Sequence, residues 1–250
     1  GLLKYKRSTS LPPVGHESSD GESGSAPSML PRIMRKSSIV LECEELPKIE
    51  LPPHTKALNR MHFDNVDVDK IRSLLESREG PLSQFMTNIL KCTDLRGTAW
   101  EDVGDDGGMA RPSCMSRSER RRWKRAMRYR YLMPVPEDVP DMVARTLKMP
   151  AELSGATLCC MSYTEHELLM CQRSHADVLY GDRFRVQNLL LVKASPNGGV
   201  DLCQFGEVVW IQPLPWGQGL VGKIIEKRVL HELKDRARDF ERILTEAVGA

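Results

Sequence analysis

The spacing of hydrophobic residues changes along the second part of the chain. Apolar positions at Val68, Ile71 and Leu75 recur with a helical period that ends before Gly80. A second short helix is predicted over residues 85–90 by the same spacing. Two helices are therefore expected to precede any strand.

Strand-like patterns follow these helices. Tyr129 and Tyr131 alternate with Arg128 and Arg130, which predicts a half-buried strand with a basic outer face. A short strand is also expected beside Trp100. Four further apolar runs, separated by turn residues, predict an antiparallel meander over residues 155–166, 167–177, 183–195 and 199–212. Residues 137–150 suggest a helical insertion between strands.

The chain finishes with a long amphipathic segment. From Trp216 onward, apolar residues recur on one helical face and charged residues on the other, over about thirty residues or roughly 45 Å. Helices, a meander and a long last helix predict an α+β fold rather than α/β. The last helix should bury its apolar stripe against the concave side of a curved antiparallel sheet.

Composition separates a linker from a domain. Residues 1–60 contain nine Ser, seven Pro and four Gly but one aromatic residue, Tyr5, so they are expected to form a disordered linker. Residues 61–250 hold the other aromatic residues and form the predicted domain. No apolar run is long enough to span a bilayer. The seven cysteines include no C-x-x-C pair, which favours free, buried thiols over disulfides or a zinc site.

The glycines near the start of the last helix approach a phosphate-binding motif. Gly217, Gly219, Gly222 and Lys223 fit the spacing, but Ile224 stands where a P-loop needs a hydroxyl group for magnesium. We therefore expect no nucleotide, and we interpret the glycines as a turn and a close helix approach. Neither G-x-S-x-G nor H-E-x-x-H is present. The sequence predicts a protein that is not an enzyme, with no catalytic residues, no cofactor and no metal.

A dense basic segment precedes the first long strand. Residues 117–130 carry eight basic side chains against one acidic side chain, a local net charge of +7. Such a cluster attracts anionic lipid headgroups or nucleic-acid phosphates, although it can also be a solvated strand edge. Contact with an anionic membrane surface is the preferred interpretation and nucleic acid the less favoured one. The candidate membrane-contact residues are Arg120, Arg121, Arg122, Trp123, Lys124 and Arg125.

The order of these motifs resembles a known family, the VASt domain. This is the StAR-related lipid-transfer-like module of the Aster (GRAM-domain-containing) sterol-transport proteins, and the resemblance covers about residues 83–248. The segment FMTNILKCTDLRGTAWEDVG resembles the family's opening helix and first strand, and RYRYLMP resembles its next strand. A family element is matched by Asp177, Tyr180, Asp182 and Phe184. The family's signature end is matched by Trp216, Gly219, Ile225 and Glu226.

The resemblance implies a START-like helix-grip fold with a lipid-sized cavity between the sheet and the last helix. It further implies a sterol or similar lipid as ligand, transferred between membranes at the cytosolic face of intracellular membranes, such as the endoplasmic reticulum or contact sites. A carrier needs apolar walls and a few polar groups. The candidate lipid-binding residues are Tyr129, Tyr131, Leu158, Tyr163, Tyr180, Phe184, Leu190, Val192, Phe205, Val209, Leu220 and Ile224. The alternative is a START-like scaffold without a ligand, which uses its basic segment to contact membranes or partners.

Overall fold

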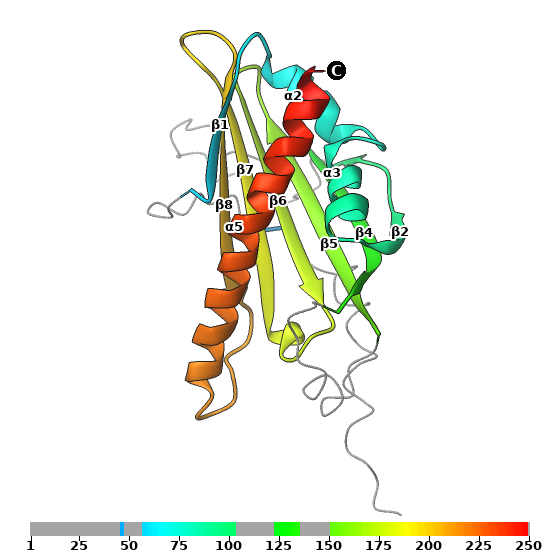
Figure 1. Ribbon diagram of the computed structural model, residues 1–250, viewed down its shortest axis with the longest axis vertical. Coiled ribbons are helices and arrows are strands. Elements are labelled where there is room, and N and C mark those ends of the chain that lie inside the picture. Colours follow the sequence, from blue (N-terminus) through cyan, green and yellow to red (C-terminus); the bar gives the residue numbers. More distant parts are fainter. Residues whose placement is uncertain (1–45, 48–56, 104–122, 136–150, 250) are drawn as a thin grey trace, which may run out of the picture. The chain divides into compact units, whose positions relative to one another are not determined.

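One antiparallel sheet organises the fold. The computed structural model describes residues 46–47, 57–103, 123–135 and 151–249. Within them, eight strands form one sheet in the order β1-β8-β7-β6-β5-β4-β2, with β3 also paired to β4 (Figure 1). The predicted meander is confirmed, because each of its strands pairs antiparallel with the next: β4 (Arg125–Pro134), β5 (Glu152–Tyr163), β6 (Glu167–Ala176), β7 (Phe184–Ala194) and β8 (Val200–Trp210).

Three short strands lie at the edges of this meander. The strands β2 (Thr93–Gly97) and β3 (Glu101–Asp102) pair with β4, on either side of the tryptophan where one strand was expected. The strand β1 (Asn59–Phe63) pairs with β8 and was not predicted. Its sequence, NRMHF, offers only two apolar residues to a strand pattern, and it crosses the expected domain boundary at residue 61. The ordered sheet therefore begins two residues before that boundary.

The two predicted opening helices are confirmed. The first, α2 (Val68–Glu76), is capped by Asp67, whose carboxylate accepts the backbone N–H of Lys70 at 2.6 Å. The second, α3 (Pro81–Gln84), begins with proline at its first position and continues into the π-helical turn η1 (Phe85–Ile89). A 3-10 turn, η2 (Gly181–Arg183), joins β6 to β7.

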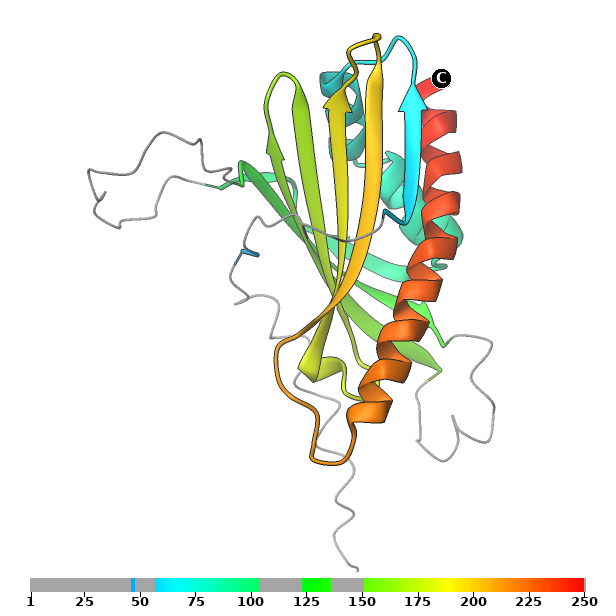
Figure 2. The same ribbon diagram turned by 90° about the vertical axis from the view of Figure 1, so that its left-hand side faces the viewer.

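The long last helix, α5 (Gly219–Gly249), is confirmed and begins three residues later than expected. It packs on β8 and β1 and contacts α2, α3 and η1 (Figure 2). Its second half is buried through Ala237, Phe240 and Leu244, and the Phe240 ring meets the Phe85 ring edge-to-face at 5.7 Å. The chain is thus an α+β fold with a curved antiparallel sheet and a long C-terminal helix, as predicted.

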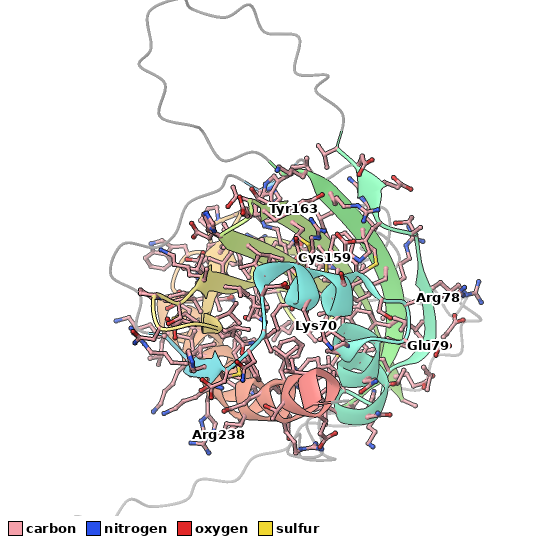
Figure 3. The ribbon with its side chains drawn as sticks, turned by 90° about the horizontal axis from the view of Figure 1, so that it is seen from above. Lys70, Arg78, Glu79, Cys159, Tyr163 and Arg238 are labelled. Carbon is pink, nitrogen blue, oxygen red and sulfur yellow. The ribbon has the colours of Figure 1, made fainter. Side chains whose placement is uncertain are left out.

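The sheet has two unlike faces. We call the side that carries α2, α3, η1 and α5 the helix face, and the opposite side the outer face; Figure 3 shows these helices on the same side of the sheet. On the helix face, Met161, Met170 and Leu190 pack with Phe240 and α2. On the outer face, a separate apolar cluster includes Leu158. Because side chains alternate along a strand, each central strand contributes to both clusters.

The structure bears on the predictions about the cysteines and about membrane-spanning segments. The five cysteines of the described residues are free thiols and four of them are buried, as expected. None of the helices in the described ranges has the length and apolar character that crossing a bilayer requires. The predicted helical insertion over residues 137–150 lies outside the described residues.

Candidate functional site

A row of three amide side chains crosses the helix face near its middle. Asn188 on β7 and Gln172 on β6 are register partners, and Gln204 on β8 lies on the same face, two residues from Gly206, the register partner of Asn188. Gln204 Nε2 donates to Asn188 Oδ1 at 3.3 Å, and Asn188 Nδ2 donates to Gln172 Oε1 at 3.2 Å. We call these residues the amide row. Their hydrogen bonds run in one direction along the row.

The amide row ends at an acceptor that has no donor. Gln204 is 4% exposed, and its Oε1 is buried without a hydrogen-bond partner in the part of the chain that the structure describes. Leaving such an acceptor unsatisfied costs about 1–3 kcal/mol. On the same face of β8, Leu202 precedes it by two residues and is fully buried. A buried polar group kept at this cost is a functional candidate.

A second polar group lies on the helix face beside the amide row. The hydroxyl groups of Tyr131 and Thr157 are 3.4 Å apart, and those of Thr157 and Ser174 are 2.9 Å apart. We call these three residues the hydroxyl cluster. They come from β4, β5 and β6, so the helix face carries polar groups on all five central strands.

The titratable groups between the row and the cluster stay neutral at physiological pH. Burial raises the pKa of Cys159 to about 12, and burial raises the pKa of Tyr129 well above its usual value. The pKa of Tyr131 is also raised, again chiefly by burial. The Cys159 thiol and the Tyr129 hydroxyl are 3.8 Å apart and contact each other. These groups therefore offer hydrogen bonds rather than charge.

The helix that covers this site is held unevenly along its length. Leu233 packs directly over Gly206 of β8, where a Cβ would lie 2.7 Å from the Leu233 Cδ1 atom, so any larger residue would require the leucine side chain to shift. Nearer its beginning, α5 is tied to β8 by a 2.6 Å hydrogen bond from Trp210 Nε1 to Glu226 Oε1. In the first turns, Leu220 and Ile224 are exposed, whereas Val221 and Ile225 are half-buried.

Exposed apolar side chains gather at the end of the domain where α5 begins. Trp216 is fully exposed, and Leu220 and Ile224 are 71% and 58% exposed. Leu179, which precedes η2, and Ile211, which follows β8, are also exposed. The backbone N–H of residue 211 donates to the carbonyl of Arg183 in η2 at 2.9 Å, and Figures 1 and 2 both place η2 and the beginning of α5 at the same end of the sheet. We call this surface the apolar end; its residues are Leu179, Ile211, Trp216, Leu220 and Ile224.

The predicted lipid-binding residues fall into three groups. Those on the helix face are Tyr129, Tyr131, Tyr163, Phe184, Leu190 and Val192. Three lie on the outer face, so the prediction that they line a space beneath α5 is wrong: Leu158, Phe205 and Val209. The remaining three lie at or near the end where α5 begins: Tyr180, which caps η2, and the exposed Leu220 and Ile224.

The reason for the wrong assignment is local to the strands. Around Leu158, Cys159, Cys160 and Met161, every side chain is fully buried. A strand buried on both faces reads as a continuous apolar run, so the sequence carries no period that distinguishes one face from the other. Only the pairing register with the neighbouring strands shows which face each of these side chains occupies.

The predicted membrane-contact segment is partly corrected. Trp123 is buried: its Nε1 donates to the Pro47 carbonyl at 2.5 Å, and its ring packs in the outer-face cluster beside Leu46. Arg125 is half-buried and pairs with Glu76 of α2 at 2.7 Å, so it ties a helix to the sheet. Lys124 lies over the ring of Tyr163 at 4.7 Å. The other three, Arg120, Arg121 and Arg122, lie outside the described residues.

The glycines of the near-P-loop have structural roles. Gly217 adopts a φ of 83°, which favours glycine in a tight turn. A Cβ on Gly222 would lie 2.9 Å from Leu214 Cδ1, so this position lets α5 approach the preceding loop. These roles agree with the interpretation of the motif as a turn and a close approach.

Sequence reasoning missed the amide row. Each of its residues is an ordinary polar position within a strand. The one signal in the sequence is that they are sixteen residues apart, from one strand to the next with a turn between, which could have indicated that they lie side by side in the sheet. No model of a known protein family matches the chain, and no curated protein matches it. The function must therefore be argued from the site.

Proposed function

We propose that this chain is a non-enzymatic lipid-binding module of START-like helix-grip type. It binds a sterol or a similar lipid in a cavity between the helix face and α5, and it transfers that lipid between membranes at the cytosolic face of intracellular membranes. The observation that carries the proposal is the set of neutral polar groups within an otherwise apolar helix face. An amphipathic lipid needs this combination of apolar walls and a few orienting dipoles.

The electrostatics of the site support binding rather than catalysis. Burial raises the pKa of Cys159 and Tyr129, so neither is poised to act as a nucleophile or a general base near pH 7. The charged residues of α5 that lie nearby are engaged with partners: Arg236 with Glu232 at 2.9 Å, and Glu241 with Asn59 at 2.7 Å. Arg236 is paired with a carboxylate, and Glu241 accepts a hydrogen bond from a neutral amide, so these two groups favour a neutral ligand over an anionic one.

The apolar end supports transfer, because a carrier must dock on a bilayer to load and release its lipid. Residues 208–225 contain a single charged residue, Lys223, which is positive. An exposed tryptophan with neighbouring aliphatic side chains and a basic residue is typical of a surface that enters the membrane interface. We therefore place the membrane contact at the apolar end rather than at residues 123–125.

The test is a titration of the 250-residue chain with the fluorescent sterol dehydroergosterol, followed by transfer between donor and acceptor liposomes. We expect saturable binding of one sterol per chain and transfer that rises with protein concentration. Absence of binding by folded protein, across sterols, sphingolipids and phospholipids, would reject the proposal.

The same titration tests the ligand-free scaffold. That alternative is favoured by the tight packing of Leu190 and Val192 against Phe240, which fills the helix face near α2. A scaffold would bind vesicles through the apolar end without taking up sterol. Vesicle binding and sterol uptake are therefore measured separately.

A further inference from the structure

The direction of the hydrogen bonds along the amide row indicates the chemical class of the ligand. We propose that Gln204 Oε1 accepts a hydrogen bond from a hydroxyl group of the bound lipid, so that the ligand is a neutral lipid alcohol. This inference rests on the proposed lipid-binding function and specifies its polar contact. It assigns Gln204 as the residue that selects for the hydroxyl group.

One atom of the row is left without any hydrogen-bond partner among the described residues, and its polarity is defined. Asn188 uses its amide N–H on Gln172 and its carbonyl oxygen on Gln204. Gln204 in turn uses an N–H on Asn188, which leaves its carbonyl oxygen without a donor among the described residues. A carbonyl oxygen only accepts, so the group that completes the row must donate.

The neighbourhood selects a hydroxyl group among donors. On the same face of β8, Gln204 is flanked by Leu202 and Gly206, and Leu233 of α5 covers the glycine. Burial of a charged ammonium group costs far more than burial of a neutral hydroxyl group, whose cost is offset by one hydrogen bond. A carboxylate or phosphate would bring oxygen atoms against the Gln204 oxygen and the nearby Glu241 carboxylate, which accepts from Asn59, the register partner of Gln204.

The experiment compares a matched alcohol and ketone. The 250-residue chain is loaded with dehydroergosterol, which is then displaced by 5α-cholestanol or by 5α-cholestan-3-one; the ketone keeps an acceptor but has lost the donor. We expect the alcohol to bind about tenfold tighter, the change in affinity that one net hydrogen bond between neutral groups brings. In Gln204→Leu the ratio of the two affinities should fall to about one.

The control is Gln187→Leu, which replaces another buried glutamine on the outer face of β7. Its alcohol-to-ketone ratio should remain that of the wild type, and circular dichroism checks that both variants fold. The comparison in the wild-type chain needs no variant, so a misfolded Gln204→Leu does not block the test.

The outcomes separate the inference from the function on which it rests. Equal affinity for alcohol and ketone in the wild type, or tighter binding of the ketone, would overturn the inference while leaving a lipid-binding module. An unchanged alcohol preference in folded Gln204→Leu would also overturn it. If folded wild-type protein takes up no dehydroergosterol and no other lipid, the proposed function fails and the inference fails with it.

Discussion

The apolar end gives a quantitative prediction for membrane binding. The double variant Leu220→Gln, Ile224→Gln removes two aliphatic side chains that are 71% and 58% exposed, and therefore contribute little to the folded core. Full burial of such a side chain is worth about 1.5–3 kcal/mol, so the exposed fractions together correspond to about 2–4 kcal/mol of membrane partitioning. The partition coefficient should fall by about 30-fold to several hundred-fold.

The assay is flotation with vesicles of phosphatidylcholine and phosphatidylserine, at low and high salt. The matched control is Leu230→Gln, a residue of the same helix that is 38% exposed and lies beyond the apolar end. It should leave partitioning close to that of the wild type. Insertion of aliphatic side chains is weakly sensitive to salt, whereas attraction through a basic segment falls steeply as salt rises. If the double variant partitioned as strongly as the wild type, the assignment of this surface would be refuted. An equal loss of partitioning in Leu230→Gln would refute it as well.

Three further predictions concern the fold that holds the site. Trp210→Phe removes the hydrogen bond to Glu226, and denaturant unfolding should show a loss of about 1.5 kcal/mol, since the acceptor is a carboxylate; no loss would mean that the bond does not hold α5. Gly155→Ala places a methyl group against the ring of Tyr131, and the melting temperature should fall by an amount that corresponds to about 1–3 kcal/mol; an unchanged melting temperature would show that the ring can move. Burial, and then a neighbouring arginine, lowers the pKa of His175 from 6.5 to about 4, so only the unfolded chain takes up this proton between those pH values. The free energy of unfolding should therefore decrease by about 1.4 kcal/mol per pH unit as pH falls from 6.5 to 4, and His175→Gln should reduce that slope.

The sequence predicted where the helices and strands lie better than it predicted which face of the sheet each side chain occupies. The helical period of α2 and the turn-separated runs of the meander are local signals, and the structure confirms both. The strand β1 escaped prediction because it gains its stability from pairing with β8 and from burying Met61 and Phe63 in the helix-face core. Such long-range pairing leaves little trace in a five-residue stretch.

The basic segment led to wrong predictions for two of its residues. Trp123 and Arg125 belong to a segment whose composition indicates a solvated or membrane-facing surface. In the fold, the first is buried against the outer-face cluster and the second forms an ion pair with Glu76. Net charge describes a segment, whereas the alternation of a strand decides where each of its side chains goes.

The packing of α5 links the two parts of the proposed function. Phe240 and Leu244 fix the second half of the helix in the core, while the first turns depend on the Trp210–Glu226 bond and on Gly222. Leu233 covers the sheet at Gly206, two residues along β8 from the amide row. Local opening is easiest where few apolar side chains are buried, so it should begin at the first turns and reach the row from the apolar end. In the proposed function, docking that end on a bilayer would bury the exposed side chains at the place where the lipid alcohol would enter, so one helix would serve both membrane contact and ligand access.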